Sequence, residues 1–179
     1  MVEDLVSRGV DLDGVVYASV AIASNAEESP FFRPSHFVLG TTFAEHPPLG
    51  LWLERIWFGA LGDAFYVEKL WGILWLLCTC MAMAWFWRLS GPRVGKAWLP
   101  IALFLALPLT RDVAVNGYLE APLAFATTLG AGFALHRSRW VVAALGLLAG
   151  CAVMIKGPPG SFILAVPPIV SWIRNEPIW

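Results

Sequence analysis

The stretch LWGILWLLCTCMAMAWFW, residues 70–87, contains eighteen residues and no charged side chain. A helix that crosses the hydrocarbon core of a bilayer needs about 20 mostly apolar residues, with a range of roughly 17–25. This run therefore predicts a membrane-spanning helix. Over the whole chain 58% of residues are hydrophobic and 14% are charged, whereas about 25% are charged in ordinary soluble domains. Both features predict an integral membrane protein.

Shorter apolar runs follow the first one, at residues 97–110, 119–135, 140–155 and 159–173. Together with the first run they predict an all-α membrane protein in which region 67–179 forms a bundle of about five transmembrane helices. Region 1–66 contains no spanning segment. It is expected to be an extracytoplasmic loop region that carries surface helices.

Lys and Arg residues between the runs predict the orientation, because cytoplasmic loops are enriched in them. The basic residues and one histidine after the first, third and fifth runs are Arg88, Arg93, Lys96, His136, Arg137, Arg139 and Arg174. Alternate crossings place all of them on one side, predicted to be cytoplasmic. Region 1–66 holds nine of the thirteen acids and falls on the outer side. A spanning helix is therefore expected before Met1. No basic stripe indicates a nucleic-acid partner.

The sequence PPLGLWLERIWFGALG, residues 47–62, predicts an amphipathic helix. Its apolar side chains recur at helical spacing, at Leu49, Trp52, Leu53, Ile56, Trp57 and Ala60. Glu54 and Arg55 lie opposite this face. The tryptophans favour a helix in the outer membrane interface, and the alternative is a helix buried under other protein. A further helix is expected over 14–26, with Asp13 as its N-cap, followed by an extended loop over 30–42.

Five polar residues are expected on the outer side, and each has a structural and a functional interpretation. Asp13 is either a helix cap or a general base that accepts a proton from a hydroxyl, with Asp11 as a competitor. Glu45 and His46 are either a polar loop end or part of an anion site at a helix N-terminus. Glu45 itself would oppose phosphate and suits a metal, another cation or a sugar hydroxyl.

The other two polar residues lie near the ends of apolar runs. Glu120 either reaches toward water from the end of a span or is a functional carboxylate within the membrane. Lys156 is either an interfacial anchor or the counter-charge to a lipid-linked phosphate. If the predicted crossings are right, all five side chains share one membrane surface.

The motifs DGVVYA, EHPPLGLWL, YLEAPLAF and IKGPPG, in this order, resemble polyprenyl-phosphate-dependent glycosyltransferases of the GT-C class. The branch that they resemble contains protein O-mannosyltransferases and the bacterial aminoarabinose transferase of lipid A. The resemblance covers nearly the whole chain. It implies a bacterial inner-membrane enzyme with an outward-facing active site that moves a sugar from a polyprenyl-phosphate donor to a glycan, lipid or protein acceptor.

The resemblance also implies roles for individual residues. Asp13, four positions before Tyr17, takes the place of the catalytic base, and Glu120 takes the place of a second acid. Tyr17, Glu45, His46 and Lys156 take the places of substrate-binding residues. His46 replaces the lysine usual in the family, and Val16 replaces an arginine of the aminoarabinose branch. A divalent metal, with Glu45 as a ligand, is a further candidate.

Two other functions fit a chain of this composition. One is a fragment of a transporter, because charged residues within membranes often mark solute paths. The other is a non-catalytic membrane scaffold subunit. The expected clustering of polar residues at a single surface favours the glycosyltransferase, either complete or as an N-terminal fragment.

Overall fold

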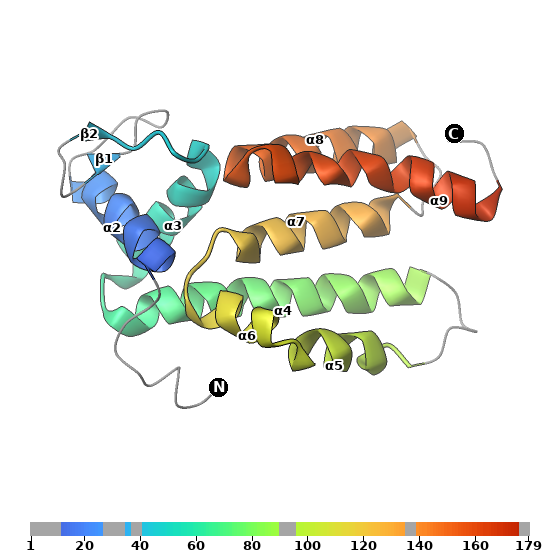
Figure 1. The fold of residues 1–179 in the computed structure, drawn as a ribbon, viewed down its shortest axis with the longest axis horizontal. Helices are drawn as coiled ribbons and strands as arrows, with labels where there is room; N and C mark the ends of the chain where they lie inside the picture. Colours follow the sequence, from blue (N-terminus) through green and yellow to red (C-terminus); the bar gives the residue numbers. More distant parts are fainter. Residues whose placement is uncertain (1–11, 27–34, 37–40, 90–95, 135–138, 176–179) are drawn as a thin grey trace.

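The computed structural model describes residues 12–26, 35–36, 41–89, 96–134 and 139–175. Its elements are α2 (Leu12–Ala26), β1 (Ser35–His36), β2 (Thr41–Thr42), α3 (Pro48–Leu61), α4 (Phe65–Leu89), α5 (Trp98–Ala106), α6 (Pro108–Val115), α7 (Glu120–Phe133), α8 (Arg139–Lys156), the 3-10 helix η1 (Pro158–Ala165) and α9 (Val166–Arg174). Figure 1 shows α4, α5, α7, α8 and α9 side by side, with α2, α3 and the small β1–β2 pair at one end.

The helix α4 confirms the span predicted from the first apolar run. It has 25 residues, and only 22% of its most apolar window is buried inside the protein. A long helix that exposes so much apolar surface fits a lipid environment rather than a protein core.

The expected count of about five spans is not confirmed. Among the described residues α4 alone is long and apolar enough to cross a membrane, and α5 with α6 forms a second span only if the bent pair is counted as one. Residues 97–110 were expected to be continuous, but the chain is extended at Leu107 and bends by 75° before Pro108 begins α6. Proline cannot continue a helix without losing a hydrogen bond, so the break follows from the sequence.

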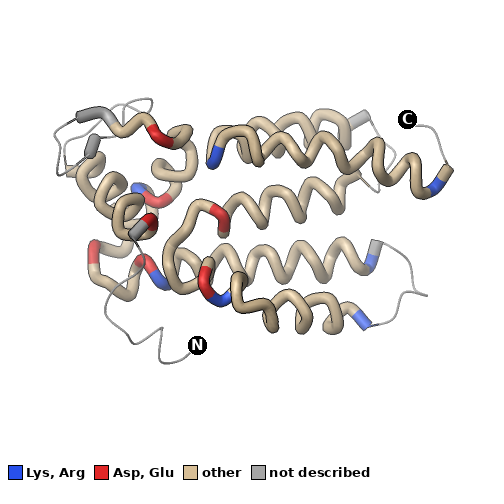
Figure 2. Tube along the Cα trace, in the orientation of Figure 1, with Lys and Arg blue, Asp and Glu red and all other residues tan. Residues whose placement is uncertain are grey.

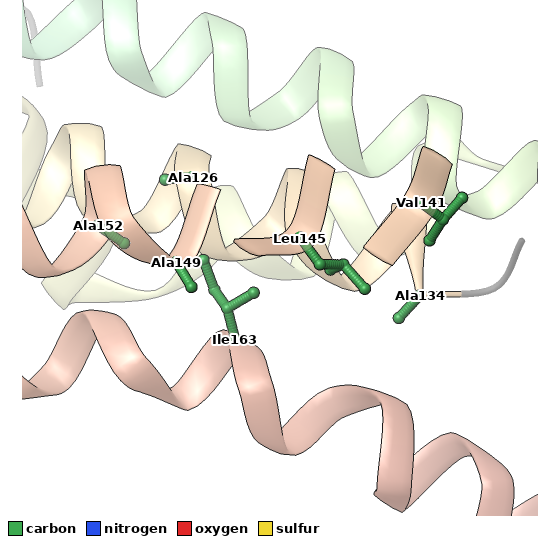
Figure 3. Packing of buried hydrophobic residues seen from close by; sticks show 7 residues of the cluster. All are labelled: Ala126, Ala134, Val141, Leu145, Ala149, Ala152 and Ile163. Carbon is green, nitrogen blue, oxygen red and sulfur yellow. The ribbon is translucent and has the colours of Figure 1, made fainter. Parts of the chain in front are cut away.

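The helices α7, α8 and η1 pack through small side chains. Their buried cluster consists of Ala126, Ala134, Val141, Leu145, Ala149, Ala152 and Ile163 (Figure 3). At Gly160 of η1 a Cβ would lie 2.2 Å from the carbonyl carbon of Ala152. Small residues at such contacts let helix backbones approach closely, which is how helices associate without a hydrophobic driving force in lipid.

The prediction for α3 holds in part. Its buried residues are Gly50, Leu51, Glu54 and Phe58, while Ile56 on the predicted apolar face is 63% exposed. The side that packs most closely on protein therefore contains Glu54. The predicted apolar face is divided, because Ile56 and Ala60 are exposed whereas Leu49 and Trp57 pack against buried clusters. One side of the helix is covered by protein and the other is exposed, so its place in the membrane interface stays a prediction.

The helix α2 begins at Leu12, so Asp13 lies inside the first turn and is not the N-cap that was predicted. Helix ends vary by one or two residues, but a side chain within the turn points outward instead of back over the end. Within the loop predicted over 30–42, β1 pairs antiparallel with β2. Residues 30–34 and 37–40 of that loop lie outside the described part, as does Asp11.

Charge is distributed unevenly along the bundle. Figure 2 shows the acidic residues of the described part gathered at the end where α2 and α3 pack. Arg88 and Arg174 lie in the last turns of α4 and α9, which reach the opposite end (Figure 1). The described acids therefore lie toward one end, where Lys and Arg residues are also present (Figure 2), whereas the far end carries Arg88 and Arg174. That the acidic end faces outward stays a prediction.

Candidate functional site

A buried apolar cluster brings the four motifs together. It consists of Tyr17, Val20, Phe43, Leu51, Leu119 and Ile155. These residues belong to α2, the loop before α3, α3 itself, the residue before α7 and the end of α8. Leu119 directly precedes Glu120, and Ile155 directly precedes Lys156. Burial of each apolar residue therefore fixes the backbone position of the charged residue that follows it.

Two contacts hold the motifs at close range. A Cβ at Gly50 of α3 would lie 2.7 Å from Cδ2 of Leu119, so the absence of a side chain there lets α3 approach α7. Pro47 lies against Gly157, whose ideal Cβ position is 3.9 Å from the proline Cγ. The EHPP and IKGPP segments, more than a hundred residues apart, therefore meet at one place.

Tyr17 and His46 form a hydrogen-bonded pair at this place. The Tyr17 hydroxyl lies 2.9 Å from Nε2 of His46, and the two rings meet edge to face with centroids 5.3 Å apart. Phe43 packs against the imidazole from the other side, with centroids 6.3 Å apart. The imidazole is thus held by one polar and two ring contacts.

Burial shifts both groups of this pair toward their neutral forms. Burial raises the pKa of Tyr17 to about 12, and the nearby Asp13 carboxylate adds to the shift. Burial lowers the pKa of His46, and the Lys156 ammonium lowers it further, against the opposing effect of Glu45. Both groups are therefore uncharged at neutral pH. In the tautomer with hydrogen on Nδ1, the phenol donates to Nε2 and Nδ1–H is left to bind a substrate.

Lys156 forms an ion pair with Glu120. The two side chains are 18% and 44% exposed, respectively, so the pair lies at the edge of the bundle rather than within it. Lys156 was expected as the counter-charge for a phosphate, and its ammonium is instead matched by a carboxylate. A phosphate that bound Lys156 would have to compete with Glu120.

Asp13 and Glu45 are exposed, yet their charges act on the Tyr17–His46 pair together with that of Glu120. All six residues selected from the sequence therefore lie within electrostatic reach of a single point. Their action on a substrate stays a prediction. The described residues bring no three His, Cys, Asp or Glu side chains into a metal-binding group, so a divalent metal at Glu45 gains no support from the donor set.

An apolar cavity of about 400 Å³ reaches this site from the bundle. Glu120 and Tyr118 lie in its wall beside apolar side chains of α4, α5, α6 and α7. Its other lining residues are Gly72, Leu76, Thr79, Phe104, Leu107, Leu109, Thr110, Val113, Ala114, Ala121 and Ala124. The cavity thus joins a charged end to an apolar interior.

Sequence reasoning did not single out Glu54, Glu68 or Lys69. All three are buried in the protein. Glu54 was placed on the polar face of its helix, and that face turned out to be the one that packs on α2 and α4. Glu68 and Lys69 stand directly before the first apolar run. An acid and a base at the start of a spanning helix are the signal that could have identified them.

The helical fold of the chain is similar to that of ArnT, as two comparisons indicate. The crystal structure of ArnT from Cupriavidus metallidurans in the apo state matches 97% of this chain with a TM-score of 0.80 and 19% identity. The crystal structure of the same protein bound to undecaprenyl phosphate matches 96%, with a TM-score of 0.77 and 20% identity.

The chain covers 34% and 32% of those two solved chains, about a third of their length. No family model matches the chain, and no curated protein sequence matches it significantly. At this level of identity the likeness shows the fold alone.

Proposed function

We propose that this chain is the donor-binding part of a membrane glycosyltransferase that transfers a sugar from a polyprenyl phosphate to an extracytoplasmic acceptor hydroxyl. The observation that carries the proposal is the convergence of Asp13, Tyr17, His46, Glu120 and Lys156 at one end of an ArnT-like fold. The similar ArnT chain was solved with undecaprenyl phosphate bound, which supports a lipid-linked phosphate as the ligand class.

The physical requirements of such a donor match the site. The isoprenoid tail must stay in an apolar environment while the phosphate reaches the polar surface. The apolar cavity beside Glu120 offers space for the part of the tail next to the phosphate. Lys156 and the Nδ1–H of His46 supply a charge and a donor for the phosphate oxygens.

In the proposed reaction the acceptor hydroxyl oxygen attacks the anomeric carbon of the sugar. The bond between that carbon and the phosphate oxygen breaks, and polyprenyl phosphate leaves. Asp13 accepts the hydroxyl proton, and Lys156 stabilises the negative charge that develops on the leaving phosphate. Glu45 and Glu120 are placed to hold sugar hydroxyl groups. The sugar and the acceptor are left open.

The test uses the gene expressed in membranes together with its flanking coding sequence. Transfer of a labelled sugar from a lipid-linked donor is measured for Asp13→Asn and for Asp63→Asn, whose carboxylate is an exposed acid in the link between α3 and α4. We expect Asp13→Asn to lose about a hundredfold or more in rate and Asp63→Asn to retain activity. Equal rates for Asp13→Asn and the parent would reject the base.

Ligand binding by the chain alone is a separate measurement. Native mass spectrometry of the purified chain with undecaprenyl phosphate should detect a one-to-one complex. The Lys156→Met variant should weaken it, because the phosphate loses its cationic partner. If the chain bound the neutral alcohol undecaprenol with the same affinity as undecaprenyl phosphate, the result would contradict a phosphate site.

A further inference from the structure

Glu54 is the most unusual buried residue in the described part of the chain. It lies in the middle of α3, between the buried residues Leu51 and Phe58, and its exposed fraction is 0%. Neither of its carboxylate oxygens has a hydrogen-bond partner among the described residues. An ionised carboxylate in such a place loses its hydration without replacement, which is among the most costly states in a protein.

The groups around Glu54 do not offset a negative charge. The helices packed on α3 are α2, α4 and α8, and the titratable groups that they carry include Asp13, Tyr17, Glu68, Lys69 and Lys156. The charge that acts on Glu54 is that of Glu68, whose Oε1 is likewise buried and has no hydrogen-bond partner in the described part of the chain.

The cations near Glu54 are engaged with other groups. Lys156 pairs with Glu120, and the charge of Lys69 acts on Glu68. On α3 itself, the Arg55 guanidinium lies 4.3 Å above the ring of Trp52. Among the described residues, Glu54 therefore faces a neighbouring acid and no matching cation.

The contact between α3 and α4 is otherwise apolar. The Trp57 and Trp71 rings pack with centroids 5.9 Å apart, and Nε1 of Trp57 donates to the backbone carbonyl of Val67 at 2.7 Å. That indole is thus committed to the backbone and does not serve Glu54. Burial raises the pKa of the Glu54 carboxyl well above its ordinary value, and Glu68 raises it further.

We propose that Glu54 is a proton-binding site, held as a neutral carboxylic acid, and that its ionisation releases α3 from α2 and α4. The helix begins two residues after His46, so the docking of the loop with Glu45 and His46 depends on this proton. The bound proton keeps the site assembled, and its loss as the pH rises loosens the site.

The expected size follows from proton linkage. The carboxyl titrates near its ordinary pKa of 4.5 when α3 is undocked and at a higher pH when α3 is docked. Between these two values, each pH unit shifts the equilibrium about tenfold toward the undocked helix. The effect is absent below the ordinary value, where both states carry the proton.

Hydrogen exchange of the α3 backbone amides tests this proposal in the full chain in lipid nanodiscs. Exchange rates are measured from pH 5 to pH 8 for the parent, Glu54→Gln and Glu54→Met. The rate of the parent divided by that of each neutral variant at the same pH cancels the intrinsic pH dependence of exchange. We expect this ratio to rise with pH by up to about tenfold per unit.

The exposed acid Asp63 provides the matched control, and Asp63→Asn should keep the parental behaviour. Two neutral variants are used because one of them alone can fail to fold for reasons of shape. A ratio that stays constant with pH for both variants would overturn the proposal. Faster α3 exchange in the parent after removal of metal ions by a chelator would also overturn it, since a cation would then occupy the site.

Discussion

The hydroxyl of Tyr17 in α2 lies 2.9 Å from Nε2 of His46, in the loop that leads into α3. The two residues are 29 positions apart in the chain, and the contact fixes the orientation of the imidazole. This relationship decides which nitrogen of His46 is left for a ligand.

Removing the Tyr17 hydroxyl should weaken phosphate binding without unfolding the chain. The Tyr17→Phe variant keeps the buried ring but loses the hydrogen bond, which is worth about 1 kcal/mol. Affinity for undecaprenyl phosphate should fall by about fivefold, measured by native mass spectrometry or by tryptophan quenching. Tyr66→Phe, in which an exposed hydroxyl is removed, should bind as the parent does. A Tyr17→Phe variant with unchanged affinity would show that the tyrosine does not orient the imidazole.

Protonation of His46 should destabilise the ligand-free protein at low pH. Its pKa is lowered from 6.5 on folding, by burial and then by Lys156, so the unfolded chain binds more protons than the folded one. This contribution to stability is present above pH 6.5 and is lost as the pH falls through the lowered value. The melting temperature of the parent should therefore decline below pH 6.5 more steeply than that of His46→Gln. Identical declines would contradict the buried, neutral imidazole.

Because Glu120 and Lys156 form an ion pair, Glu120→Gln and Lys156→Met should change phosphate binding in opposite directions. Glu120→Gln frees the ammonium, so binding of undecaprenyl phosphate should tighten, whereas sugar transfer should fall if Glu120 holds the sugar. Lys156→Met should weaken phosphate binding. Because Glu120 is 44% exposed, the coupling energy in a double-mutant cycle on thermal stability should be small, at most about 1 kcal/mol. Weaker phosphate binding in Glu120→Gln would mean that Lys156 does not exchange partners.

A side chain at Gly14 should separate α2 from the turn before α7. A Cβ there would lie 1.9 Å from the backbone oxygen of Asn116 and 3.0 Å from Oε1 of Glu68. Gly14→Ala should cost about 1–3 kcal/mol of stability through overpacking. Gly146→Ala in α8, where a Cβ meets nothing within 4 Å, should instead stabilise by about 0.5–1 kcal/mol. Thermal unfolding in one detergent compares the two, and equal effects would contradict the close approach at Gly14.

The parts of the fold that the sequence predicted are those that depend on local pattern. The uncharged run at 70–87 lies within α4, and the apolar spacing around Trp52 and Ile56 lies within the helix α3. The length of apolar runs did not reveal the break at Leu107, because apolar residues on both sides hide a change in backbone direction. Only Pro108 marked the position.

For the candidate site, the sequence predicted which residues belong to it but not which side chains they contact. The motifs pointed to His46 and Lys156, but the contacts that occupy them, Tyr17 and Glu120, come from other helices. Glu54 escaped notice because helical periodicity separates a polar face from an apolar face without saying which one meets protein. In a membrane protein apolar side chains can be exposed to lipid while the other side of the helix packs on protein. In α3 the side that packs on protein contains Glu54.

The 75° bend between α5 and α6 has a consequence for how a long-chain lipid gains access to the cavity. Leu107 and Leu109 at the bend are exposed while also lining the cavity, so apolar side chains surround an opening there. A tail that slides in laterally never leaves hydrocarbon, whereas lifting it through water would cost about 0.8 kcal/mol for each methylene. For the lipid donor proposed above, the kink would let the tail pass from the membrane to the cavity without leaving one leaflet.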